Sequence, residues 1–164
     1  RGTPLQLAKD EGASFEGIHA LNTQLTNRHP DATRLYISAR SDIKDDDGKV
    51  VFKRTWLRLT RRAVRDYNFR GTDISGTLDM WANVRRGEKL YISPYKDTAH
   101  IKFDSALPYE TSVMAAYAKP IMAAVPAENQ RRHELLNLVA AFDRFEPIDP
   151  KLAPPDSLIH EFIG

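Results

Sequence analysis

The sequence predicts an α+β fold in which a mostly antiparallel sheet of two hairpins is flanked by helices. Two observations lead to this fold class. Apolar residues recur with helical spacing in some segments and alternate in others, and turn-forming residues separate the alternating segments in pairs. The elements are expected in the order αα-ββ-αα-ββ-αα, which is typical of helices packed against an antiparallel sheet.

Length and composition favour one domain, residues 1–164. Its 41% hydrophobic and 28% charged residues are ordinary for a globular chain. The chain begins at Arg1 and not at methionine, which is compatible with a piece excised from a longer protein. There is no cysteine, which excludes disulfides and thiolate chemistry. No apolar run approaches about 18 residues, so no membrane-spanning helix is expected.

The first half is predicted to contain two helices and one hairpin. Thr, Pro and Gly at the cap positions indicate a helix at 3–12, and apolar spacing indicates another at 14–27. Alternation then predicts a strand at 33–40. The sequence DDDGK is typical of a turn, and 49–60 is the returning strand.

The second half is predicted to continue with a short helix at 60–64 and a longer one at 73–86, which Gly87 closes. A second hairpin is expected around the sequence SPYKD. Its two strands are expected at 88–93 and 98–104. Two helices, 109–125 and 127–145, and an extended proline-rich segment, 146–157, are expected after it.

Two motifs resemble metal-binding sites, but both lack residues at positions where metal ligands are required. In the sequence HELLN, Asn137 stands where a zinc-protease motif has its second histidine, and His133 alone cannot hold catalytic zinc. In the sequence DIKDDDG, an EF-hand frame would begin at Ile43 and end at Arg54, neither of which is a calcium ligand. No metal and no cofactor are therefore expected.

Basic residues are concentrated between Lys53 and Arg70, where seven stand against one acid, although the net charge of the chain is only +2. Alternation would place two aromatic and two basic side chains on one strand face. This face fits either a stacking platform for single-stranded nucleic acid or a helix-covered surface with arginine stems along the rings. The near-neutral charge favours the covered surface. The four residues are Phe52, Arg54, Trp56 and Arg58.

The sequence RRGEKLYISP suggests an anion pocket. Arg70, Arg85 and Arg86 are expected at element ends close to Tyr91. Guanidinium groups with a phenol suit a phosphate, because the planar fork matches its oxygens. The alternative is that these arginines pair with the acidic DDD turn or face water, and composition alone favours that alternative.

Three segments resemble consecutive parts of the phosphothreonine lyase effectors that bacteria secrete into host cells. The segments are YISAR (36–40), FRGTD (69–73) and GEKLYISP (87–94), and they cover the middle third to half of the chain. The resemblance implies elimination of phosphate from phosphothreonine by a lysine base and a histidine acid, with arginines holding the phosphate. It places Arg70 at the base position, matches Tyr91 to a substrate-side tyrosine, and puts the phosphate-binding arginine near Asn83, two positions before Arg85. Arg40 closes the first segment.

The sequence departs from this family at the positions of the catalytic residues. Thr55-Trp56-Leu57 stands where the K-x-H strand should be, so the acid is missing. Arg70 stays protonated at physiological pH, which makes it a poor base but a good phosphate clamp. The chain is thus either a divergent lyase-like domain or one that has kept the fold without the reaction.

These observations lead to one functional hypothesis and one alternative. The hypothesis is a lyase-like bacterial effector domain that engages a phosphorylated or anionic ligand through Arg70, Arg85, Tyr91 and Arg40, with or without β-elimination. The alternative is a non-catalytic module that binds protein or nucleic acid on the basic 52–70 face. The expected partner is a host or bacterial protein, including a phosphorylated one. Nucleic acid is less favoured, and a membrane is not expected. With no signal peptide, the protein is expected to be secreted into a host cell or cytoplasmic.

Overall fold

The structure, a computed structural model, describes residues 6–164 and confirms a mixed α+β fold. It divides into two compact units. The first contains the described residues up to Tyr36 together with Gly87–Lys102, and the second contains Ile37–Arg86 and Phe103–Gly164. The elements are α1 (Thr23–Thr26), β1 (Leu35–Ser38), β2 (Ile43–Lys44), β3 (Val50–Phe52), α2 (Arg54–Arg70), α3 (Ile74–Tyr91), η1 (Ser93–Thr98), β4 (Ile101–Asp104), α4 (Glu110–Ala123), α5 (Arg132–Ala141), η2 (Phe142–Arg144), η3 (Pro150–Leu152) and α6 (His160–Ile163).

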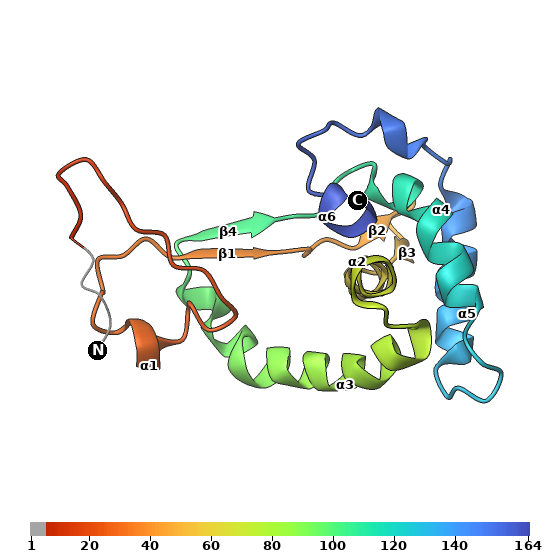
Figure 1. The fold of residues 1–164 in the computed structure, drawn as a ribbon, viewed down its shortest axis with the longest axis horizontal. Coiled ribbons are helices and arrows are strands. Elements are labelled where there is room, and N and C mark those ends of the chain that lie inside the picture. The colour runs from red at the N-terminus through yellow and green to blue at the C-terminus, as the bar shows by residue number, and fades with distance from the viewer. Residues whose placement is uncertain (1–5) are drawn as a thin grey trace. The chain divides into compact units, whose positions relative to one another are not determined.

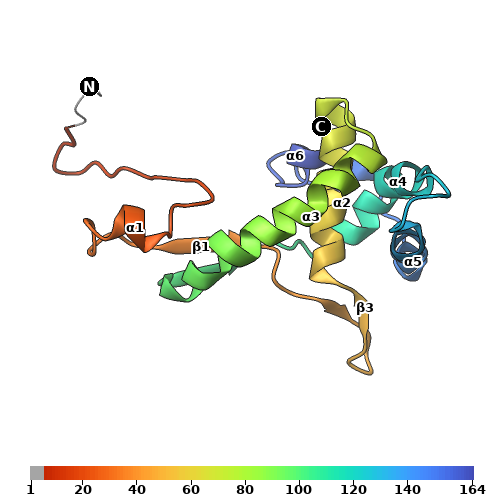
Figure 2. The same ribbon diagram turned by 90° about the horizontal axis from the view of Figure 1, so that it is seen from below.

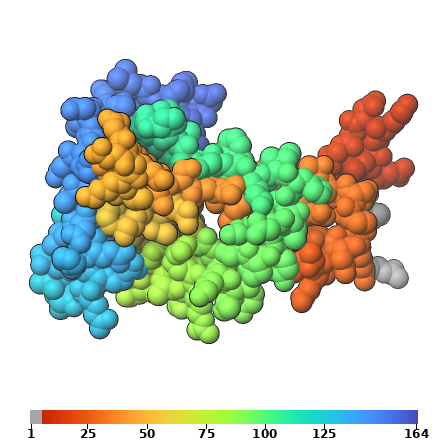
Figure 3. Space-filling model, turned by 180° about the vertical axis from the view of Figure 1, so that it is seen from behind, coloured from red at the N-terminus to blue at the C-terminus, as the bar shows by residue number. Residues whose placement is uncertain are grey.

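The strands form two separate two-stranded sheets, so the predicted single sheet of two hairpins was wrong. β1 pairs with β4, and β2 pairs antiparallel with β3. The DDDGK turn is confirmed, with Gly48 at φ 79° where a side chain would be strained. The hairpin that it closes lies against the C-terminal part of the second unit, where Arg144 Nη2 is 3.4 Å from Asp45 Oδ2 (Figure 3).

Helix α2 replaces most of the predicted returning strand 49–60. That strand ends at Phe52, and the predicted short helix 60–64 is the middle of a 17-residue helix (Figure 2). The segment satisfies both periods, because apolar residues alternate up to Leu59 and also recur at helical spacing through Leu57, Ala63 and Val64. The helical stripe is the one that the core buries. Asp42 Oδ1 accepts the first helical amide at 2.7 Å, which further favours the helix.

Helix α3 continues through the predicted boundary at Gly87, so the predicted strand 88–93 was wrong. Gly87 has no positive φ and lies inside an 18-residue helix. A glycine in a helix interior costs only about 1 kcal/mol, and the residues that follow it, Glu88, Lys89 and Leu90, are good helix formers. The hairpin partner 98–104 is realised only as β4, after the 3₁₀ segment η1.

The two predicted C-terminal helices are confirmed as α4 and α5, the latter extended by η2. Within the second unit, α2 packs against α4 and α6, and α5 packs against α4 (Figure 1). Their buried side chains form the main core, which includes Val64, Met114, Met122, Leu135 and Leu138. The proline-rich segment 146–157 contains one short 3₁₀ turn, η3.

The predicted N-terminal helices are mostly absent. Thr3 and Pro4 lie outside the described residues, and residues 6–12 are not helical. Of the predicted helix 14–27, only α1 forms. Its expected apolar stripe is not buried, since Phe15 is 83% and Ile18 70% exposed. A short helix without tertiary packing is marginal in water, which explains the loss.

A buried ion pair joins α2 to the start of α4. Glu110 is 1% exposed, and its two carboxylate oxygens accept from Arg61 Nε and Nη2, the second at 2.7 Å. Arg61 also donates from Nη1 to Ser105 Oγ at 3.0 Å and from Nη2 to the Ser105 carbonyl at 2.6 Å. Its guanidinium carbon lies 5.2 Å from the centroid of the Phe162 ring of α6. Arg61 therefore connects three elements of the second unit.

We expect Glu110→Ala to lower the free energy of unfolding by about 3–5 kcal/mol, because it leaves a buried guanidinium without its counter-charge. Urea denaturation followed by circular dichroism measures this change. The matched control is Asp143→Ala, which breaks the exposed Lys119–Asp143 pair and should cost less than about 1 kcal/mol. Equal small losses in the two variants would contradict the role assigned to Arg61.

Candidate functional site

Helix α2 separates Arg54 of the predicted basic face from Arg70 of the predicted ligand site. Arg54 opens this 17-residue helix and Arg70 closes it. At about 1.5 Å of rise per residue, the two positions are about 24 Å apart. A single phosphate group therefore cannot contact both, and each end of α2 has to be considered as a site in its own right.

The C-terminal end of α2 carries a cluster around one buried carboxylate, here called the Asp66 cluster. Asp66 is fully buried, and its Oδ1 accepts from Arg70 Nη1 at 3.0 Å. Its Oδ2 lies 3.2 Å from Arg62 Nε as an ion pair and 3.5 Å from Thr77 Oγ1 of α3. Two guanidinium groups thus share one carboxylate, which leaves a surplus positive charge. The Arg70 side chain is 52% exposed, so part of this charge faces solvent.

The N-terminal end of α2 holds Arg40 and Arg54 in a network of hydrogen bonds. Arg54 Nη1 donates to the Arg40 carbonyl at 3.2 Å. Asp104 accepts at Oδ1 from the Arg40 amide at 3.0 Å and at Oδ2 from the hydroxyl of Ser41. Partial burial raises the pKa of Asp104, but the Ser41 hydroxyl and the amides of residues 40, 41 and 106 together outweigh it and lower that pKa. Asp104 therefore stays ionised and fixes this turn.

The predicted basic and aromatic strand face does not form, because residues 54–58 are helical. Phe52 is fully buried, with its ring centroid 5.0 Å from that of Phe142 and 5.7 Å from that of Trp56. A ring in this position cannot stack on a base. The guanidinium of Arg58 instead lies 6.0 Å from the centroid of the Trp81 ring, which is a cation–π contact between α2 and α3.

Arg85 and Tyr91 both lie on α3 but belong to different compact units. Arg85 is partly buried, one turn beyond Trp81 on α3, and it has an interaction partner of its own. Tyr91 is the last residue of α3 and is 56% exposed, and its ring centroid is 6.4 Å from that of His19 in the first unit. Their predicted role as one ligand-binding pair stays a prediction.

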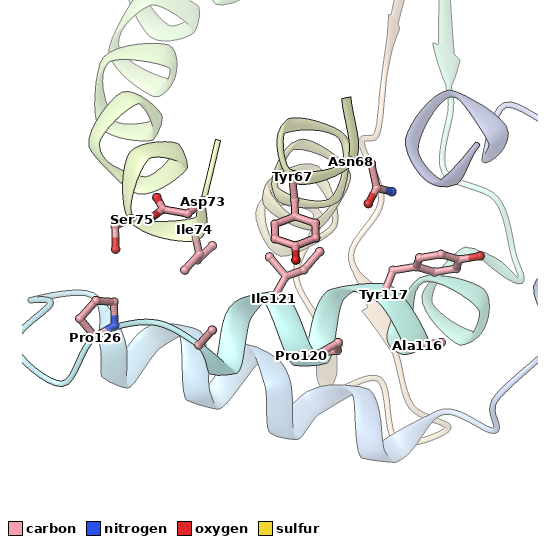
Figure 4. Close-up of a pocket in the computed structure, with 11 residues that line it drawn as sticks. Tyr67, Asn68, Asp73, Ile74, Ser75, Ala116, Tyr117, Pro120, Ile121 and Pro126 are labelled. Carbon is pink, nitrogen blue, oxygen red and sulfur yellow. The ribbon is translucent and has the colours of Figure 1, made fainter. Parts of the chain in front are cut away.

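A groove that the sequence did not predict lies beside the Asp66 cluster, and it is called the α4 groove here. It has a volume of about 460 Å³ and is formed by the end of α2, the start of α3 and one face of α4 (Figure 4). The main lining residues are Tyr67, Asn68, Asp73, Tyr117, Pro120 and Ile121. One sequence signal was available, namely Pro120 inside an otherwise helical segment, because such a proline marks an irregular helix surface.

Known proteins give no guide to this site. No protein-family model matches the sequence, and neither curated proteins nor solved structures include a significant match. Among residues 6–164, no group of three or more His, Asp or Glu side chains is arranged to hold a metal ion. No helix within that same range is long and apolar enough to cross a membrane. The chemistry of the site therefore has to be argued from its own residues.

The lowered pKa of Asp104 predicts a stability contribution that depends on pH. Its ionised form is favoured in the folded state, so the contribution is complete above the ordinary aspartate pKa of about 3.9 and is lost as the pH falls through the lower folded value. We expect the difference in unfolding free energy between the wild type and Asp104→Asn to shrink on acidification below about pH 4. Denaturant titrations at several pH values measure it, and a difference independent of pH would contradict this assignment.

Proposed function

We propose that this chain binds a phosphorylated or otherwise anionic segment of another protein at the Asp66 cluster. The observation that carries the proposal is the sharing of one fully buried carboxylate by Arg62 and Arg70. Asp66 neutralises only one of the two guanidinium groups. The second positive charge remains for a ligand, at a helix end where Arg70 is half exposed.

Arg70 has the features expected of a phosphate ligand. Its contact with Asp66 uses Nη1, so Nε and Nη2 remain as a planar pair of donors that matches two phosphate oxygens. Because Asp66 holds the guanidinium from one side, less side-chain entropy is lost when the other side binds. Arg70 is thus oriented before the ligand arrives.

Binding is proposed without a catalytic step of its own. Arg70 stands at the base position implied by the resemblance to the lyase effectors, but a guanidinium does not accept a proton at neutral pH. The position of the missing K-x-H acid, residues 55–57, lies inside α2. β-Elimination is therefore kept as an outcome to be measured.

A nucleic-acid ligand is the second candidate, since α2 carries six arginines, namely Arg54, Arg58, Arg61, Arg62, Arg65 and Arg70. Two of them do not favour this candidate: Arg61 is neutralised by Glu110, and Arg65 Nη1 lies 3.1 Å from Glu161 Oε1. The buried Phe52 also provides no stacking surface. The proposal is therefore a single anionic group on a protein segment.

We expect Arg70→Gln to abolish the preference for a phosphothreonine peptide over its unphosphorylated form. The loss of a charge-assisted hydrogen bond is worth about 1.5–3 kcal/mol, which is about 10- to 150-fold in affinity. Fluorescence anisotropy with labelled peptides measures both affinities. The control variant is Arg132→Gln, which removes an exposed arginine at the start of α5 and should leave the preference intact.

Two further measurements on the same samples distinguish the proposed binding from β-elimination and from nucleic-acid binding. The intact mass of the phosphopeptide reports β-elimination directly, because the reaction removes phosphoric acid and leaves a dehydrated residue. A single-stranded oligonucleotide tested at several salt concentrations reports nucleic-acid binding, whose affinity falls steeply with salt. A wild-type protein that does not distinguish the two peptides would overturn the proposed function.

A further inference from the structure

We infer that the α4 groove is a second binding site, for a short extended peptide segment with a central apolar residue and a basic residue at the Asp73 end. The inference deepens the proposed function by naming the residues that flank the anionic group. It rests on the proposed function only for the phosphate, because the groove is formed without Arg70. Figure 4 shows its residues arranged along α4.

The middle of the groove is apolar and shaped by helices. Ile121 and Pro120 of α4 form one side, and Tyr67 points from α2 toward α4 between the two helices (Figure 4). Ile74 adds an apolar wall at the start of α3. An aliphatic side chain placed here loses its contact with water, which is the main source of affinity in such a groove.

The length of the groove favours a short extended chain. Its α4 residues run from Ala116 to Ala124, which is about 12 Å of helix at about 1.5 Å per residue. An extended chain covers about 3.3 Å per residue, so about four residues fit along it.

Three polar groups of the groove are left as hydrogen-bond acceptors. Asp73 accepts the Gly76 amide at Oδ1, at 2.8 Å, so its second oxygen is the one left to face a ligand. Pro120 has no N–H, so the Ala116 carbonyl lacks its usual helical donor. Asn68 donates its Nδ2 to the Phe162 carbonyl at 3.1 Å, so its amide oxygen is the atom left to accept.

The charge of the lining residues favours a ligand with a basic residue at the Asp73 end of the groove. Among the described residues that line the groove, Asp73 is the one charged side chain, and none of them is a lysine, arginine or histidine. A lysine or arginine of the ligand therefore finds a counter-charge there. A polyanion such as nucleic acid would instead be repelled by Asp73.

The closeness of this groove to the Asp66 cluster follows from the chain itself. Arg70 stands between the lining residues 67–68 and 73–75 in sequence. One bound segment can therefore place its anionic group on Arg70 and the neighbouring apolar and basic residues along α4. The expected ligand is a segment that carries an anionic group together with an apolar and a basic residue.

The experiment uses a positional-scanning array of synthetic peptides, each made with threonine and with phosphothreonine, and probed with the whole chain. We expect the tightest peptides to carry leucine or isoleucine within a few residues of the threonine and lysine or arginine beyond it. Asp73→Asn keeps an amide oxygen for the helix cap but removes the charge, so it should abolish the preference for lysine over glutamate at that position.

A second variant tests whether the peptide occupies the α4 groove. Ala116→Arg introduces bulk and positive charge at an exposed position that lines the groove, and it should lower the affinity for the selected peptides at least tenfold. Ala123→Arg is the matched control, because Ala123 is also exposed on α4 but does not line the groove. Circular dichroism confirms that each variant is folded.

The outcomes for the two sites are distinguishable. If the wild type binds both peptide forms equally well and Ala116→Arg weakens the binding of both, the groove inference is supported and the proposed function is overturned. If the phosphate preference holds but Ala116→Arg binds like the wild type, the groove inference is overturned. An array without any preference for apolar and basic residues, or a lysine preference that survives Asp73→Asn, overturns it as well.

Discussion

The packing of the second compact unit depends on the partners that neutralise the arginine side chains of helix α2. Arg61 points into the core, where the 1%-exposed Glu110 and the Ser105 hydroxyl and carbonyl satisfy its guanidinium. Without these partners a buried guanidinium would oppose the packing of α2 against α4, because its desolvation would be uncompensated. With them, the helix is fixed by an interaction that is both ionic and directional.

The same helix leaves its remaining charge at its C-terminal end. Asp66 is buried between α2 and α3 and binds two guanidinium groups with one carboxylate, so Arg70 is held in place while the two arginines together keep one surplus positive charge. A cation near a helix C-terminus also interacts favourably with the helix dipole. The α4 groove beside it has an acidic residue instead. The two features together describe a surface for a protein segment with separated charges.

The sequence predicted helices α4 and α5 and the DDDGK turn, and these were confirmed. The helix expected at 14–27 formed only as α1, because Phe15 and Ile18 find no core to pack against. The segment around Leu57 fits both a strand and a helix, and the choice depended on a core formed by residues far away in the chain. Asp66 was visible as one acid among arginines, but its burial is a tertiary property. The α4 groove likewise depends on how three helices meet.

The most direct test observes the arginine side chains during binding. The Nε–Hε resonances of the protein, assigned by arginine substitutions, are followed while a phosphothreonine peptide is added. The account predicts that the Arg70 resonance, followed by that of Arg62, shifts with the phosphorylated peptide and not with its unphosphorylated form, while Arg61 stays unchanged. Small, equal shifts of all exposed arginines, or no difference between the two peptides, would contradict the proposal that the Asp66 cluster binds an anionic group.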